Sequence, residues 1–257
     1  QEYIRWERRL FAKLEAQIGR LEALEDSESL EALAETQGAC ENLELPAWIT
    51  PDTQPLPANQ LWILGASLGG PAAVKQFLDA LPPGLPVAFV YAQHIDARFS
   101  KVLSQVLTRD AHYHMVCAEE GRPLYSGEVL QVPVETEIWI DDEARVHFLD
   151  EAWNGPYGPS IDQVMMNLSR TFREHCHAII FSGMGNDGAL AAPALQQSGS
   201  HVWIQSPENC ASGAMPESVR ATGACGFEGT PAHLAARLLR TIEEQHLLSS
   251  KPNCNSA

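Results

Sequence analysis

The stretch Leu-Trp-Ile-Leu-Gly-Ala-Ser-Leu-Gly-Gly-Pro, residues 61–71, decides the fold. Its apolar run stops at a glycine, one serine stands among small residues, and Pro71 begins a helix-like segment. This order predicts a buried strand that turns tightly into a helix. The segment from Gly65 to Gly69 also matches G-x-S-x-G, the pattern that places a nucleophilic serine on such a turn. Two interpretations of Ser67 therefore stay open: a nucleophile, or part of a structural glycine-rich turn.

The same rhythm of an apolar run followed by a helical segment repeats along the chain. The runs LWIL, PVAFVYA, HAIIFS and HVWIQ precede segments with helical character at 70–80, 97–109, 187–197 and 212–221. We therefore predict an α/β fold, with a doubly wound, mostly parallel sheet, helices on both of its faces and an antiparallel hairpin as an insertion or edge.

Residues 111–148 do not follow that rhythm. The segment GEVLQVPVETEIWIDDEARVHFL favours two or three antiparallel strands, with Asp141-Asp142-Glu143 at a turn. We interpret this acidic triplet as a solvated turn rather than a metal site. Beyond it, Ser160 followed by Gln163 has the spacing of a capping box and predicts a helix start.

Composition changes near residue 60, where we place a domain boundary. Residues 1–60 hold 12 Asp and Glu against 5 Lys and Arg, apolar residues at helical spacing, and a proline-rich stretch. We predict an amphipathic helix and an acidic, Pro-rich linker at 1–60, a catalytic domain at 61–245, and a tail at 246–257.

Charge and cysteine content exclude several classes of protein. A formal net charge of −16 argues against binding to nucleic acid or to an anionic membrane surface. The six cysteines form no CxxC pair, as expected of free thiols in a reducing compartment. The apolar runs are shorter than the roughly 18–20 residues that span a bilayer. We expect a cytoplasmic protein that uses neither a metal nor an organic cofactor.

Two polar residues at other predicted strand ends could complete a catalytic set with Ser67. His94 ends the second parallel strand, and Asp187 follows the glycine-rich turn after the strand AIIFS. The carboxyl ends of parallel strands share one crevice, so a base and a carboxylate could meet the serine there. Asp187 could equally be a helix N-cap.

The order Ser67, His94, Asp187 differs from that of α/β-hydrolases, in which the histidine comes last. A generic small-ester hydrolase of that type would use one of the late histidines, His201, His233 or His246. A nucleotide site is a weaker interpretation, because the stretch lacks Gly-Lys-Ser/Thr and has serine where a dinucleotide fingerprint has its middle glycine.

Five blocks in one order resemble the catalytic domain of the chemotaxis protein-glutamate methylesterases, the CheB family. They are GASLGGP, QHIDARFSKVL, PSIDQVM, IIFSGMGNDGA and SPENCASGAMPESV, and the similarity covers roughly residues 61–240. The resemblance implies a serine esterase that hydrolyses glutamate γ-methyl esters on the cytoplasmic helices of methyl-accepting chemoreceptors, with glutamine deamidation in many members. It also implies an upstream receiver domain, with residues 1–60 as a following linker or as the end of another module.

The resemblance assigns roles to individual positions. Ser67 corresponds to the nucleophile, His94 to the general base and Asp187 to the carboxylate that orients it. The backbone N–H groups of Met184 and His94 correspond to the oxyanion donors. The alternative from another class is a relative that binds a receptor without turnover.

Four departures indicate a divergent member of the family. Leu68 stands where the family commonly has Thr, and Gly158 where an Arg precedes Pro-Ser. The hairpin has Val-Pro-Val-Glu-Thr-Glu at 132–137 in place of Ala-Pro-Gly and a His, and 223–226 replaces a Gly-x-Val-Asp block. The rim of the site has therefore changed more than its proposed catalytic residues.

Overall fold

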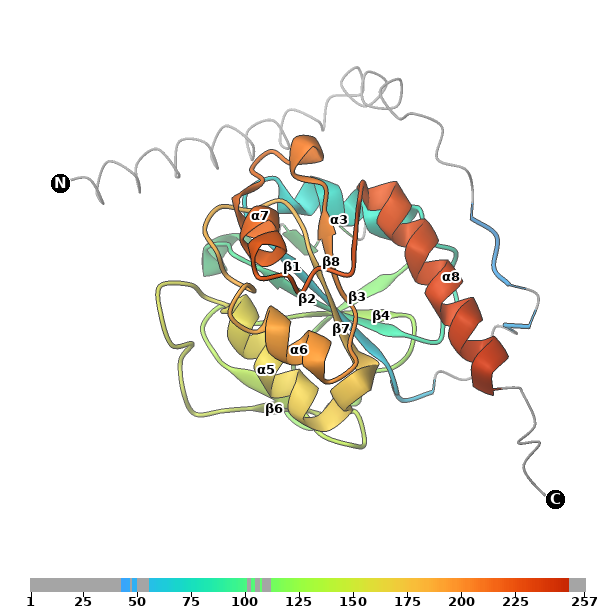
Figure 1. Ribbon diagram of the computed structural model, residues 1–257. Helices are drawn as coiled ribbons and strands as arrows, with labels where there is room; N and C mark the ends of the chain where they lie inside the picture. The colour runs from blue at the N-terminus through green and yellow to red at the C-terminus, as the bar shows by residue number, and fades with distance from the viewer. Residues whose placement is uncertain are drawn as a thin grey trace, which may run out of the picture. The chain divides into compact units, whose positions relative to one another are not determined.

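The protein is built around a central parallel sheet. The computed structural model describes residues 43–46, 48–49, 56–100, 103–104, 107 and 112–249. Seven strands are paired in the order β3-β4-β2-β1-β7-β8-β9, and each pairing is parallel (Figure 1). The strands are β1 Leu61–Ala66, β2 Ala88–Gln93, β3 His114–Cys117, β4 Glu128–Gln131, β7 Cys176–Ile180, β8 Val202–Gln205 and β9 Phe227–Gly229.

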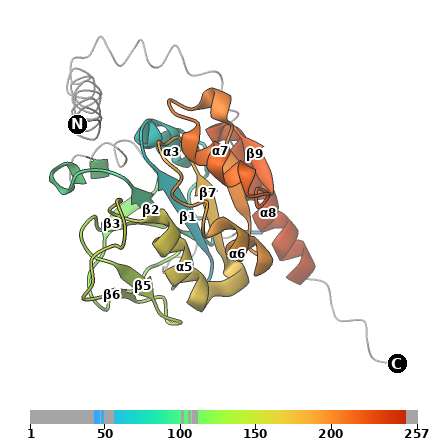
Figure 2. The same ribbon diagram turned by 60° about the vertical axis from the view of Figure 1, so that its left-hand side comes forward.

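Helices cover both faces of this sheet (Figures 1 and 2). The helices α5, α6 and α7 pack in one apolar cluster, and α3 and α8 pack in the other. Their bounds are α3 Gly70–Asp79, α5 Ile161–Phe172, α6 Ala192–Gln197, α7 Ala214–Ala221 and α8 Pro231–Ser249, with short 3-10 turns η2 Ala97–Phe99, η3 Arg173–His175 and η4 Pro207–Asn209.

The central strand β1 explains why both faces are covered. Its six residues are all buried. Leu61 and Ile63 pack in the cluster under α5, whereas Trp62 and Leu64 pack in the cluster under α3 and α8. Side chains alternate between the two faces of a strand, so a continuous apolar run needs cover on both. The predicted doubly wound α/β fold is therefore confirmed.

The segment 111–148 is only partly as predicted. An antiparallel hairpin does form, from β5 Ile138–Ile140 and β6 Val146–Phe148, with the acidic triplet at its turn. However, β4 pairs in parallel with β2 and β3 within the main sheet, so the antiparallel interpretation was wrong for β4. Alternation of apolar residues shows that a strand is half-buried and does not reveal the direction of its partner.

The start of α5 also corrects one detail. Ser160 caps the helix, since its side chain accepts a hydrogen bond from the Gln163 N–H at 3.4 Å. The Gln163 side chain does not complete the capping box, because its Oε1 accepts from the Asn154 N–H at 3.0 Å. The predicted helix and linker at 1–60 and the tail at 246–257 lie mostly outside the described residues.

Candidate active site

Ser67 lies on the turn that joins β1 to α3. Its N–H donates to the Ser182 carbonyl at 3.0 Å, and its own carbonyl accepts from the Gly70 N–H at 2.9 Å. Gly69 has a positive φ of 79°, and a Cβ there would come within 2.4 Å of the Ala211 Cβ. Only glycine fits this position without strain, so the glycines predicted for a tight turn have a steric reason.

His94 is brought beside Ser67 by the register of two neighbouring strands. Ala66 pairs with Gln93, so β1 and β2 end together. Ser67 is the residue that follows β1, and His94 is the residue that follows β2. The Gln93 side chain joins the two, because its Nε2 donates to the Ser67 carbonyl at 2.9 Å and to the His94 carbonyl at 3.1 Å. The Tyr91 hydroxyl holds the other end of this amide, donating to Gln93 Oε1 at 2.6 Å.

The role of Gln93 was missed in the sequence. Its one signal is that a polar residue ends the apolar run PVAFVYA, at a position where β2 is still buried. A buried amide needs hydrogen-bond partners, and the partners found here are the backbone of the two strand ends.

Asp187 follows β7, which lies on the other side of β1 from β2, and its carboxylate contacts the His94 ring. His94 Nε2 donates to Asp187 Oδ2 at 2.8 Å, and the Asp187 side chain is only 3% exposed. The same carboxylate accepts the N–H groups of Ile161 at 2.7 Å and Asp162 at 2.9 Å. The predicted alternative, Asp187 as the N-cap of its own helix, is not formed, because α6 begins after Ala191.

The charge of Asp187 is stabilised by these contacts. Burial alone would raise the pKa of Asp187, but the hydrogen bonds from His94 and from the α5 N–H groups lower it below its ordinary value. The neighbouring Asp162 behaves in the opposite way. Burial, reinforced by the nearby charge of Asp187, raises the pKa of Asp162 to about 6. One carboxylate is therefore held ionised and the other resists ionisation.

The backbone N–H groups expected to hold an oxyanion differ in their surroundings. The His94 N–H donates to the Ala66 carbonyl at 3.0 Å, as part of the β1–β2 ladder. In this conformation the His94 N–H is paired within the sheet, and its expected role as a donor stays a prediction. Met184 lies on the turn after β7 beside two glycines and is half-buried. Its N–H has no hydrogen-bond partner among the described residues.

The serine and the histidine are neighbours without a direct hydrogen bond. Among the described residues, no hydrogen bond joins Ser67 Oγ to the His94 ring. Since Nε2 faces Asp187, Nδ1 is the ring nitrogen left for the serine proton. Such contacts often tighten only when substrate binds.

Two late histidines occupy other environments. The His201 ring stacks on Trp62 with centroids 6.1 Å apart, and His246 stacks on Trp48 at 3.7 Å. The carboxylate that a hydrolase histidine would need is instead bonded to His94. The geometry does not favour a late catalytic histidine.

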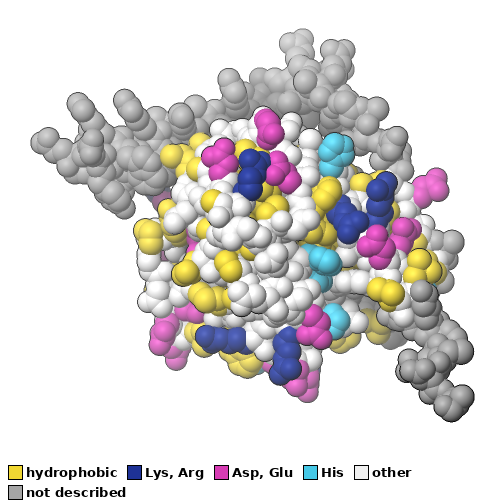
Figure 3. Space-filling view, in the orientation of Figure 1, with side chains coloured by type: hydrophobic (Ala, Val, Ile, Leu, Met, Phe, Trp, Pro, Cys, Tyr) yellow, Lys and Arg dark blue, Asp and Glu magenta, His cyan; other side chains and the backbone are white. Residues whose placement is uncertain are grey.

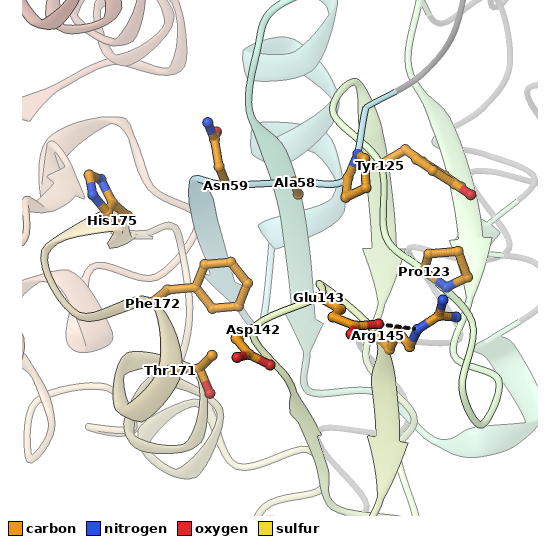
Figure 4. Close-up of a pocket in the computed structure, with 11 residues that line it drawn as sticks. Ala58, Asn59, Pro123, Tyr125, Asp142, Glu143, Arg145, Thr171, Phe172 and His175 are labelled. Carbon is orange, nitrogen blue, oxygen red and sulfur yellow. Dashed lines mark hydrogen bonds and ion pairs between the residues drawn. The ribbon is translucent and has the colours of Figure 1, made fainter. Parts of the chain in front are cut away.

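A separate pocket of about 630 Å³ lies away from this crevice (Figure 4). Asn59, which precedes β1, and His175, which precedes β7, line it together with Phe172, Tyr125 and Arg145. These positions are at the amino ends of the strands, whereas Ser67 and His94 follow the carboxyl ends. Ligands of open α/β sheets bind at the carboxyl ends, so the crevice at Ser67 is the candidate site.

The described residues hold neither a metal-ligand cluster nor a membrane-spanning helix. Within the described ranges, no group of three or more His, Cys, Asp or Glu residues is arranged to hold a metal ion. No helix in that same part of the chain is long and apolar enough to cross a bilayer.

Comparison with known proteins gives one consistent result. A family model described as CheB methylesterase matches residues 62–238. The protein-glutamate methylesterase/protein-glutamine glutaminase 1 of Saccharophagus degradans is 33% identical over 165 residues, covering 64% of this chain and 45% of that protein. The corresponding protein 3 of Geobacter sulfurreducens is 30% identical over 179 residues, covering 68% of this chain and 48% of that protein.

A solved structure shows the same fold. The crystal structure of the Thermotoga maritima CheB methylesterase catalytic domain matches with a TM-score of 0.67 at 23% identity. The match covers 71% of this chain and 98% of that domain. The chain spans about half the length of the curated relatives it matches.

Proposed function

Because this chain belongs to the CheB methylesterase family, we propose that it hydrolyses glutamate γ-methyl esters on the cytoplasmic helices of methyl-accepting chemoreceptors. The observation that carries the proposal is the hydrogen bond of 2.8 Å between His94 Nε2 and the buried Asp187 carboxylate, at the strand end beside Ser67. A receptor-binding scaffold has no need of this arrangement.

The geometry supports the following chemistry. Ser67 Oγ attacks the γ-carbonyl carbon while His94 Nδ1 takes the serine proton, and Asp187 stabilises the imidazolium through Nε2. The Met184 N–H donates to the oxyanion that forms on the γ-carbonyl oxygen. His94 then gives its proton to the leaving methanol. Water, deprotonated by the same nitrogen, releases glutamate and restores Ser67.

Deamidation of receptor glutamines uses the same steps, with ammonia leaving in place of methanol. The names of the curated relatives include protein-glutamine glutaminase activity, which supports this second reaction. The resemblance also supports a cytoplasmic location and control by a receiver domain, and we keep both as part of the proposal.

The first prediction tests the nucleophile. Purified chain and its Ser67→Ala variant are incubated with receptor fragments that carry tritiated methyl esters, and volatile methanol is counted. We expect the variant to lose at least about a thousandfold in rate, as nucleophile removal does elsewhere.

Ser198→Ala is the matched control, because Ser198 is an exposed serine at the end of α6 whose hydroxyl donates to the Leu195 carbonyl. We expect this control to retain the wild-type rate. Methanol release that survives in Ser67→Ala would rule out the mechanism. A wild-type chain that binds receptor but releases no methanol would favour the non-catalytic alternative.

A further inference from the structure

The imidazole of His94 has an aromatic partner that none of the motifs identifies. The ring of Tyr157 lies flat against it, with centroids 4.5 Å apart and planes inclined by only 3°. Tyr157 belongs to the connection between β6 and α5, three residues before the capping Ser160. The start of α5 also binds Asp187 through the N–H groups of Ile161 and Asp162. One segment of the chain therefore contacts both the ring and its carboxylate.

The hydroxyl end of Tyr157 reaches the turn that carries Met184. Gly185 has a positive φ of 90°, and a Cβ there would lie 2.5 Å from the Tyr157 hydroxyl oxygen. The half-buried tyrosine thus extends from the imidazole to the backbone beside the proposed oxyanion donor. Because the residue beside that hydroxyl is Gly185, the Tyr157 ring has room to lie parallel to the His94 ring.

One hydrogen bond does not hold an imidazole in one orientation. The bond from Nε2 to Asp187 still allows the ring to tilt about the line that joins the two atoms. A second ring in parallel contact restricts that tilt, and with it the direction of Nδ1. An aromatic face also attracts a cation stacked upon it, and His94 is a cation while it holds the serine proton.

We propose that Tyr157 is a positioning residue for His94: its ring keeps Nδ1 directed toward Ser67 and stabilises the imidazolium that forms during the reaction. The inference rests on the proposed function for its kinetic consequence. Its structural consequence, a restrained His94 ring, does not depend on which ester is cleaved.

Other charged groups near His94 must be kept constant in any test. Asp187 is bonded to the ring, and Asp162 lies behind Asp187. In the turn that follows, Asp96 and Arg98 form an ion pair with each other at 2.9 Å. Substitutions at Tyr157 leave all four in place.

Two substitutions separate the aromatic face from simple packing. Tyr157→Phe keeps the ring and removes the hydroxyl, whereas Tyr157→Leu keeps an apolar cover and removes the aromatic face. Tyr125→Leu is the matched control, because Tyr125 is a half-buried tyrosine in the pocket at the amino ends of the strands. Circular dichroism checks each fold, and Tyr157→Met replaces the leucine variant if that variant does not fold.

The kinetic readout is methanol release from methylated receptor as a function of pH. For Tyr157→Leu we expect kcat/KM to fall at least about tenfold through misplacement of the base. We also expect the acid limb of its pH profile to move to lower pH, because the imidazolium loses its aromatic partner. Tyr157→Phe should stay within about threefold of wild type, and Tyr125→Leu should match wild type.

The second readout is the proton NMR signal of the His94 Nε2–H, assigned by its loss in His94→Gln. Wild type and Tyr157→Phe should show this hydrogen-bonded proton, and Tyr157→Leu should lose it to faster exchange with water. If wild type releases no methanol, the proposed function fails while this signal still tests the restraint on the ring.

Two results would overturn the inference. A leucine variant with wild-type kinetics and an intact Nε2–H signal would show that the stack restrains nothing. A phenylalanine variant as impaired as the leucine variant would assign the effect to the hydroxyl contact at Gly185 instead of the ring.

Discussion

Asp187 and Asp162, which are joined by a hydrogen bond, show how the surroundings of a carboxyl group determine its pKa at this site. Asp187 accepts hydrogen bonds from His94 and from two backbone N–H groups, which favour its ionised form. Asp162 accepts one from the Ala191 N–H at 2.8 Å but lies beside the Asp187 charge. Identical side chains therefore differ in pKa because of their neighbours. A sequence motif does not state which of the two will stay ionised.

The raised pKa of Asp162 predicts that the free energy of unfolding depends on pH. Near pH 4 the unfolded chain releases this proton, whereas the folded chain keeps it to about pH 6. Between these values the folded state holds more protons, so the free energy of unfolding contributed by Asp162 falls as pH rises. Asp162→Asn, which imitates the protonated side chain, should remove this dependence.

Urea unfolding of both proteins at intervals from pH 4 to 7 measures the effect. We expect the wild type to lose stability relative to Asp162→Asn across pH 4–6, with a constant difference above that range. Parallel curves over the whole range would contradict the assignment of a raised pKa to Asp162.

At the scale of elements, the start of α5 and the connection before it form one side of the site. Ser160 caps α5, and the first N–H groups of α5 donate hydrogen bonds to the Asp187 carboxylate. The connection packs closely on the segment after β4, since a Cβ at Gly158 would lie 2.6 Å from the Val134 carbonyl oxygen. The arginine that the family commonly has at this position could not be placed here without moving that backbone.

Gly158→Ala should therefore destabilise the protein by about 1–3 kcal/mol, because a backbone carbonyl cannot yield as a flexible side chain does. Equilibrium unfolding in urea measures the difference. Gly226→Ala is the control, since a Cβ there would meet the Val202 carbonyl oxygen at an ordinary 3.8 Å. Equal stability of the two variants would show that Val134 moves away without cost.

At the scale of the whole molecule, acidic charge is in excess. The formal net charge is −16, and on the face shown in Figure 3 the Lys and Arg side chains lie singly or in pairs near Asp and Glu. That face offers no continuous basic surface. Repulsion among excess charges of one sign opposes the compact state, and salt screens that repulsion.

We therefore expect the melting temperature to rise by about 1–4 °C between 20 and 200 mM NaCl, as measured by differential scanning calorimetry. Between these two salt concentrations the Debye length falls from about 20 Å to below about 10 Å. A melting temperature that falls with salt would mean that the surface ion pairs outweigh the net repulsion.

The local pattern of apolar and small residues was sufficient for the fold class, the strand-to-helix turn at Ser67 and the existence of β1, β2 and β7. Burial on both faces of a strand leaves a continuous apolar run, and tight turns require glycine, so these features are visible in the chain itself. Only the tertiary structure decided which atoms meet: Asp187 with the start of α5, Gln93 with two strand ends, the paired N–H of His94, and Tyr157 on the imidazole. These contacts join residues from separate elements, and the register of the sheet and the path of its connections determine their distances. Neither is encoded in any short stretch of sequence.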